Sequence, residues 1–199
     1  MEKVTNLILA GTGGQGIVLA SRIIAWVAFK SGFDVKESEI HGMAQRGGSV
    51  VGHLRFGKKV YSPIIPLGSA DILLSLEELE ALRYIHFLKK DGVLILNRKK
   101  ILPAGISEEN YPQNVEEILK EKGFKVKSLH AEEIAKELGS LKIENTVLLG
   151  CLSAYLPFKE EIWKEVIVSS VPPDTVELNL KAFQRGRELG EKFFLEQKD

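Results

Sequence analysis

Cysteine is nearly absent from the sequence, and its scarcity limits the chemistry that the chain can carry alone. Cys151 is the only cysteine among 199 residues. A disulfide needs two thiols and an iron-sulfur cluster or an all-cysteine zinc site needs several, so this chain by itself can build none of them. His53, His86 and His130 are isolated by their spacing from any other metal-ligating side chain. We therefore expect no metal site and no catalytic side chain in this chain.

An excess of either charge and long apolar runs are also missing. Lys plus Arg equals Asp plus Glu at 27 each, so no basic surplus is available to hold nucleic acid. No run approaches the roughly 18 apolar residues of a membrane span, and the first apolar run is too short for a signal peptide. These absences predict a cytoplasmic protein that binds neither nucleic acid nor a membrane.

The composition that is present suits one globular unit. With 44% hydrophobic residues over 199 positions, we expect a single domain covering residues 1–199. Strand, helix and strand follow one another near the N-terminus and again between Ala70 and Asn97, whereas only helices are predicted after Ala131. We expect an α/β, Rossmann-like three-layer fold with a mostly parallel sheet, an edge hairpin and a helical C-terminal region.

A glycine-rich turn, Gly11-Thr12-Gly13-Gly14-Gln15-Gly16, joins the first predicted strand to the first helix. Its spacing fits G-x-G-x-x-G, in which bare backbone leaves room for an anion and directs helix N–H groups at it. The same glycines also suit a tight turn that binds nothing. A dinucleotide site expects an acid roughly 20 residues further on. Glu37 lies there, but it is equally consistent with the solvated face of a strand.

The predicted helix from Gly14 to Lys30 is apolar nearly all round. A helix on the surface of a lone domain normally keeps a polar stripe. Two explanations stay open, namely cover by the C-terminal helices of this chain and cover by another chain.

A polar loop, His41 to Gly48, precedes the strand that begins at Ser49. Its Arg46 suits a phosphate or a carboxylate, His41 can donate to the same group, and Gly47 and Gly48 allow close approach. An interface loop that pairs with a partner's carboxylate is the alternative. After the strand, a turn at 57–59 predicts a return through a short edge strand at 60–62, which completes a hairpin.

Taken together, the turn Gly11-TGGQG and the loop Ile40-HGMAQRGGSVVGHLRFG resemble the gamma-type domain of 2-oxoacid:ferredoxin oxidoreductases. Within that family the likeness is to the beta subunit of indolepyruvate:ferredoxin oxidoreductase. It continues through Ser69-ADILLSLE, Asn145-TVLLG and Asn179-LKAFQRG and so covers nearly the whole chain.

The resemblance implies one subunit of an enzyme that oxidatively decarboxylates an aryl pyruvate to an acyl-CoA and reduces ferredoxin. Thiamine diphosphate, Mg and [4Fe-4S] clusters would reside in the companion alpha subunit, with none bound by this chain alone, and coenzyme A would be the co-substrate. Under this hypothesis the first helix and the polar loop dock on the alpha subunit, and ferredoxin is met through the complex. The residues expected to approach a cofactor are Gly11, Gly13, Gly14, Gln15, Gly16, His41, Gln45, Arg46, Gly47, Gly48 and Ser49.

Two other functions remain open from the sequence. One is a free-standing Rossmann protein that binds NAD or a flavin through the glycine turn and Glu37. The other is a non-catalytic scaffold subunit whose turn stays empty.

Overall fold

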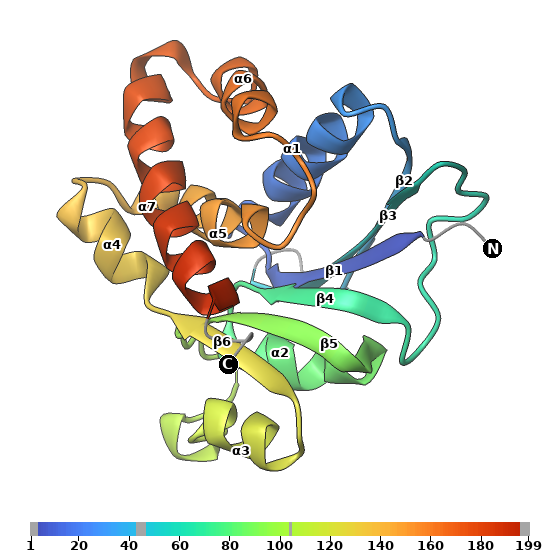
Figure 1. The fold of residues 1–199 in the computed structure, drawn as a ribbon. Coiled ribbons are helices and arrows are strands. Elements are labelled where there is room, and N and C mark those ends of the chain that lie inside the picture. Colours follow the sequence, from blue (N-terminus) through green and yellow to red (C-terminus); the bar gives the residue numbers. More distant parts are fainter. Residues whose placement is uncertain (1–3, 43–46, 104, 196–199) are drawn as a thin grey trace.

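A single six-stranded sheet forms the centre of the computed structural model, which describes residues 4–42, 47–103 and 105–195 (Figure 1). Its strand order is β2-β3-β1-β4-β5-β6. Four neighbouring strands run parallel, while β3 runs antiparallel to both β1 and β2. The strands are β1 (Thr5–Thr12), β2 (Asp34–His41), β3 (Ser49–Gly57), β4 (Ala70–Ser75), β5 (Leu88–Asn97) and β6 (Lys125–Leu129).

Helices cover both faces of this sheet, which gives three layers (Figure 1). One face carries α2 (Glu78–Tyr84) and α3 (Val115–Glu121). The other face carries α1 (Ile17–Lys30), α4 (Ala131–Glu137), α5 (Glu144–Ser153), α6 (Glu160–Ser170) and α7 (Val176–Leu195).

Successive residues of β1 point to opposite faces, so that Leu7 and Leu9 join one hydrophobic core and Ile8 joins the other. This explains why the strand is apolar at consecutive positions.

The edge hairpin is present, but its second strand is not the one expected. β3 pairs with β2 over the register from Asp34 opposite Gly57 to His41 opposite Val50. Val60 belongs to no strand, because its N–H donates to the Asp34 carboxylate, 2.9 Å away, instead of joining a ladder. Gly42 directly follows β2, and Gly47 and Gly48 directly precede β3, and we call these three residues the hairpin tip.

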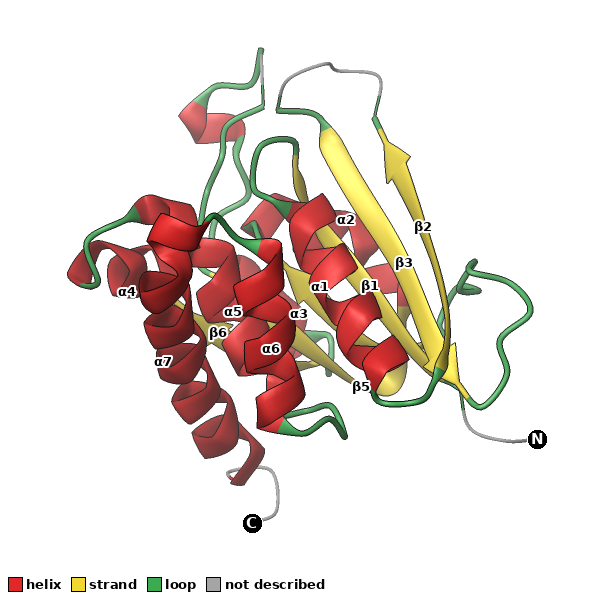
Figure 2. Cartoon of the chain, turned by 90° about the horizontal axis from the view of Figure 1, so that it is seen from above, coloured by secondary structure: helices red, strands yellow, loops and turns green. Residues whose placement is uncertain are grey.

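Cover by the C-terminal helices of this chain explains the apolar first helix only in part. The α6 helix packs against α1 from one side and the sheet covers another, as the view onto the helical layer shows (Figure 2). Trp26 and Phe29 nevertheless remain 50% and 61% exposed on the outer face of α1. The C-terminal helices of this chain thus leave an apolar stripe uncovered.

Close contact between α5 and α7 depends on glycine. A Cβ at Gly186 would lie 1.9 Å from the Val147 carbonyl oxygen, and one at Gly150 would lie 2.1 Å from the Phe183 carbonyl oxygen. Thr146 also donates to the Asn179 side chain across the same contact, at 2.7 Å. This packing holds the N-terminal end of α5 beside the glycine turn. Among the described helices, none is long and apolar enough to span a bilayer.

Candidate functional site

The glycine turn lies where the chain changes from one face of the sheet to the other. β1 and β4 are parallel neighbours, yet β1 leads into α1 on one face and β4 leads into α2 on the opposite face. In open α/β sheets such a switch point, at the carboxyl ends of the strands, is where ligands bind. The predicted turn therefore occupies the favoured position for a site.

The shape of the turn is set by glycine backbone and by one glutamine. Gly14 has φ of 99° and Gly16 has φ of 76°, in the region that L side chains rarely adopt. The Gln15 side-chain oxygen accepts the Thr12 N–H at 2.7 Å, and its amide donates to the Leu76 carbonyl at 2.9 Å. Gln15 thus ties the turn to the end of β4 and makes a structural contribution that the sequence did not reveal.

The α1 helix begins at this turn with an open N-terminus. It has no side-chain cap and no acidic residue in its first turn. Uncapped N–H groups at a helix start, together with the helix dipole, favour an anion.

The hairpin tip is joined directly to the glycine turn. The Gly13 N–H donates to the Gly48 carbonyl at 2.8 Å, and the Gly42 N–H donates to the Ser49 carbonyl at 2.8 Å. The nearest atom to a Cβ built on Gly13 would be the Gly47 nitrogen, 3.6 Å away. The two glycine-rich segments predicted separately from the sequence therefore form one site.

A cavity of about 600 Å³ opens in front of the turn. Its rims come from the turn, the hairpin tip, the segment after β5 and the start of α5. The lining residues are Thr12, Gly13, Gly14, Gln15, Gly16, Leu19, Gly47, Lys99, Ile101, Leu141, Lys142, Glu144 and Asn145. We call this space the glycine-turn pocket.

Two lysines give the glycine-turn pocket a cationic side. Lys99 lies 2.6 Å from a Glu144 carboxylate oxygen and 3.1 Å from one of Glu132. Burial lowers the pKa of Lys99, but the two carboxylates outweigh burial and raise it, so the ammonium stays charged. Lys142 lies on the same lining, as does the Glu144 carboxylate that pairs with Lys99, so the pocket offers helix N–H groups and two cations to a phosphate beside one carboxylate.

The remaining predicted residues of the polar loop have different surroundings. His41 is exposed, with its Nε2 3.5 Å from the Glu39 carboxylate. Ser49 points toward α2, where it donates to Glu80. Gln45 and Arg46 lie outside the described residues, so their expected part in the site stays a prediction.

Glu37 does not occupy the place of the ribose-binding acid of a dinucleotide fold. β3 separates β2 from β1, and the Glu37 carboxylate accepts from Ser21 of α1 at 3.1 Å. In the dinucleotide fold the second strand adjoins the first, so its acid lies beside the glycine turn. Of the two alternatives that the sequence left open for Glu37, the structure favours the exposed face of a strand, because the hairpin inserts an antiparallel strand between β1 and β2.

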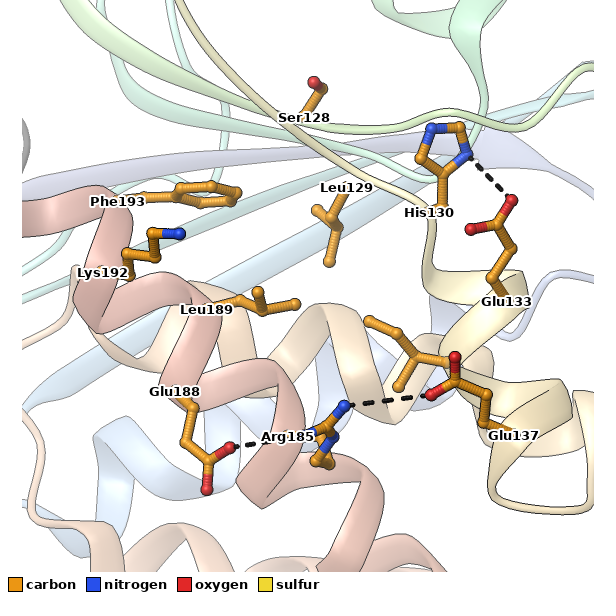
Figure 3. A pocket seen from close by; sticks show the side chains of 11 residues that line it. Ser128, Leu129, His130, Glu133, Glu137, Arg185, Glu188, Leu189, Lys192 and Phe193 are labelled. Atoms are coloured by element: carbon orange, nitrogen blue, oxygen red, sulfur yellow. Dashed lines mark ion pairs between the residues drawn. The ribbon is translucent and has the colours of Figure 1, made fainter.

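A second cavity, of about 460 Å³, lies between the end of β6, α4 and α7 (Figure 3). Several of its charges are paired within the chain. Arg185 pairs with Glu137 at 3.9 Å and with Glu188 at 4.0 Å, and His130 lies 3.8 Å from Glu133.

In the part of the chain that the structure describes, the residues form no site for a metal or cluster. Within residues 4–42, 47–103 and 105–195, no three His, Cys, Asp or Glu side chains are grouped to hold a metal ion. Cys151 is buried in α5, and burial raises the pKa of its thiol to about 12, which disfavours the thiolate that a metal would need.

Comparison with known proteins decides the family. Residues 6–189 match the pyruvate ferredoxin/flavodoxin oxidoreductase family. The chain belongs to this family. It is 42% identical over 191 residues to indolepyruvate oxidoreductase subunit IorB of Thermococcus kodakarensis, covering 92% of this chain and 95% of that subunit. It is 30% identical to 2-oxoglutarate synthase subunit KorC of Methanothermobacter thermautotrophicus over 198 residues, covering 95% and 96% of the two chains. The resemblance seen in the sequence motifs is thus confirmed.

Solved structures of family members confirm the predicted fold class. The gamma subunit of a keto/oxoacid ferredoxin oxidoreductase from Geobacter sulfurreducens superposes with a TM-score of 0.72 at 26% identity, covering 94% of this chain and 98% of that one. A 2-oxoglutarate:ferredoxin oxidoreductase from Magnetococcus marinus gives 0.77 at 21% identity, covering 96% of this chain and 32% of that longer chain.

Sequence reasoning missed the residues that come to the pocket from outside the two glycine segments. Lys99 follows the buried strand β5, and basic side chains directly after a buried strand are the signal that was overlooked. Asn145 lay within a motif used for the resemblance but was not assigned to the site. The Asn145 side chain packs against the turn, because a Cβ built on Gly16 would lie only 2.6 Å from the Asn145 amide nitrogen.

Proposed function

We propose that this chain is the non-cofactor-bearing subunit of an indolepyruvate:ferredoxin oxidoreductase. Its relatives named IorB match over more than nine-tenths of both lengths, which supports a subunit of that same enzyme. The complex would oxidise an aryl pyruvate and coenzyme A to an acyl-CoA and carbon dioxide, passing electrons to ferredoxin. Thiamine diphosphate, Mg and [4Fe-4S] clusters would belong to the companion alpha subunit. The cytoplasmic location stays a prediction.

The glycine-turn pocket is where this chain would meet coenzyme A. The observation that carries this assignment is the joining of an uncapped helix start, two lysines and the bare backbone of Gly13 in one cavity. Phosphate groups of coenzyme A would accept from such donors. The Magnetococcus enzyme that shares this fold was solved with coenzyme A bound, which supports a role of the family in handling this co-substrate.

Docking on the alpha subunit would use the outer face of α1. Trp26 and Phe29 form an edge-to-face pair there, with ring centroids 5.6 Å apart. Ile40 of β2 is likewise exposed, and Arg22 and Glu37 are polar neighbours lining a cavity beside the pair. Exposed aromatic residues surrounded by polar groups are typical of binding hot spots. Because the relatives are named as subunits at nearly this length, the alpha subunit is the occupant we propose.

Coenzyme A binding is tested in the reconstituted complex with Lys142→Ala. Losing a charged donor to phosphate costs about 1.5–3 kcal/mol, so the KM for coenzyme A should rise roughly tenfold or more while the KM for the 2-oxoacid stays unchanged. Lys164→Ala, on α6 and paired with Glu160, is the matched control and should leave both constants unchanged. Arg46→Ala, run beside these variants, tests the residue that the sequence singled out. Unchanged affinity in both Lys142→Ala and Arg46→Ala would remove coenzyme A from this pocket.

Docking is tested by measuring the affinity between the two purified subunits. Trp26→Ala should weaken the complex by about 2 kcal/mol or more, roughly 30-fold in Kd. Leu67→Ala is the control, because Leu67 is exposed on a segment bonded to His86 and away from α1. Equal affinities for Trp26→Ala and the unchanged chain would place the interface elsewhere.

One observation also agrees with the alternative function, a non-catalytic scaffold subunit with an empty turn. Gln15 uses its side chain within the fold, as a turn that binds nothing would also do. The scaffold function predicts that the alpha subunit, once stabilised by other means, keeps its full affinity for coenzyme A without this chain. A direct comparison of coenzyme A affinity with and without this chain separates the two.

A further inference from the structure

Three glutamates at the start of α2 are buried although carboxylates are normally exposed. Glu77, Glu78 and Glu80 are 0%, 1% and 2% accessible. Burying a carboxylate costs free energy unless hydrogen bonds or opposite charges compensate. None of the three lines the glycine-turn pocket, so contact with a ligand there does not explain their burial.

Glu80 holds the hairpin tip. Ser49, the first residue of β3, donates its hydroxyl to the Glu80 carboxylate, and the Tyr84 hydroxyl lies 2.9 Å from the same Ser49 oxygen. The Arg83 Nε is 3.4 Å from the other Glu80 oxygen. Ser49 in turn fixes the tip, because its carbonyl accepts from Gly42.

Glu77 holds the segment that follows β5. One carboxylate oxygen caps α2 by accepting the Glu80 N–H at 2.9 Å. The other accepts the Ile101 N–H at 3.1 Å and the Tyr111 hydroxyl. We call residues 98–103 and 105–113 the β5 connection, and Glu77 thus binds it at Ile101 near its start and at Tyr111 near its end.

Glu78 also bonds to the β5 connection, at residues that precede Ile101. Its carboxylate accepts from the Arg98 Nε at 2.7 Å, and its backbone N–H donates to the Lys99 carbonyl at 2.9 Å. The backbone of Lys99, a pocket-lining residue, is therefore fixed from α2.

We propose that the first turn of α2 is a positioning element for the glycine-turn pocket, with Glu80 placing the hairpin tip and Glu77 placing the β5 connection. The start of β3 and the end of β5 lie at the same end of the sheet (Figure 2). The two segments supply parts of the pocket lining, Gly47 from the tip and Lys99 with Ile101 from the connection. A short helix at the switch point thereby sets the distance between rims that are far apart in the sequence. The ligand in this statement is coenzyme A and rests on the proposed function, whereas the placement of the two segments does not.

Amide hydrogen exchange in the full chain, assembled with the alpha subunit, tests the placement segment by segment. Ser49→Ala should speed exchange of the hairpin tip by roughly tenfold or more, because a hydrogen bond to a buried carboxyl group is lost, and should leave the β5 connection unchanged. Tyr111→Phe should do the reverse. Glu80→Gln is the conservative variant, since its amide oxygen can still accept from Ser49, and it should stay closer to the unchanged chain than Ser49→Ala.

Ser31→Ala provides the matched control, because it also removes a serine hydrogen bond, to Val27 at the end of α1. It should change neither segment. Exchange that is unchanged in both segments, or raised equally everywhere, would overturn the positioning role.

Steady-state kinetics on the same variants separate this inference from the proposed function. Both Ser49→Ala and Tyr111→Phe should raise the KM for coenzyme A severalfold with little change in kcat. If exchange changes segment by segment while that KM does not move, the positioning role stands and coenzyme A is removed from the pocket.

Discussion

Replacing Gly16 or Gly13 by alanine tests which glycine of the turn is needed for the stability of the fold and which one leaves space for a ligand. Gly16 precedes α1 with φ of 76°, and a Cβ there would lie 2.6 Å from the Asn145 amide nitrogen. Gly13, three residues earlier, has no positive φ, and its Cβ would meet nothing closer than 3.6 Å. The two alanine variants are thus a matched pair within one turn.

The expected cost for Gly16→Ala follows from three contributions. The left-handed backbone costs a non-glycine residue about 1–2 kcal/mol. Displacing the buried Asn145 side chain adds about 1–3 kcal/mol, and the lower entropy of the unfolded alanine chain returns about 0.4–1 kcal/mol. The free energy of unfolding should therefore fall by about 3 kcal/mol, while Gly13→Ala should change it by less than about 0.5 kcal/mol.

Denaturant and thermal unfolding of the purified chain measure both changes. For a chain of this size a loss of 3 kcal/mol corresponds to a fall in Tm of roughly 6–12 °C. Gly13→Ala should keep its Tm yet weaken coenzyme A in the assembled enzyme, because the added methyl group occupies space in front of the turn. A loss below about 0.5 kcal/mol for Gly16→Ala, or equal losses for the two variants, would refute this reasoning.

Three further predictions concern the rest of the fold. Gly186→Ala should cost about 3 kcal/mol or more in chemical unfolding, because its Cβ would overlap the Val147 carbonyl oxygen; a loss under 1 kcal/mol would contradict the close helix contact. The Val60 N–H, then nearby lysines, lower the pKa of Asp34 from 3.8 to about 2. Because the folded pKa is depressed, this stabilisation is complete above about pH 4 and is lost as the pH falls through about 2. Thermal melts should therefore show a smaller fall over that window for Asp34→Asn than for the unchanged chain. Cys151, with its pKa raised to about 12 by burial, should react with a thiol reagent only after unfolding, and rapid labelling of the folded chain would show otherwise.

The layered architecture was predictable because it is encoded locally. The run Leu7–Ala10 is fully buried between two helical layers, as continuous apolar residues in a parallel strand indicate. The C-terminal helices fall where the sequence predicted helices only. The position of the turn was likewise predictable from its glycines, because Gly14 and Gly16 adopt the positive φ angles that favour glycine.

The pairing of the edge hairpin was not predictable in the same way. Residues 34–41 and 60–62 are both short segments with some strand character, but only the first pairs with β3, while the Val60 N–H donates to the Asp34 carboxylate. Strand partners are chosen by contacts between distant residues, which periodicity within one segment does not contain.

The amino-acid sequence by itself determined the strands, the helices, the glycine turn and the family motifs, because each depends on residues that are neighbours along the chain. Only the tertiary structure brought Gly13 to Gly48, placed Lys99 beside the turn and buried Glu77 and Glu80 beneath the two rims. Nothing in the local pattern of a glutamate-rich helix start distinguishes a buried carboxylate from a solvated one. That distinction arises when Ser49 and Tyr111, 31 and 34 residues away from their partners, arrive with hydrogen-bond donors that compensate the lost water.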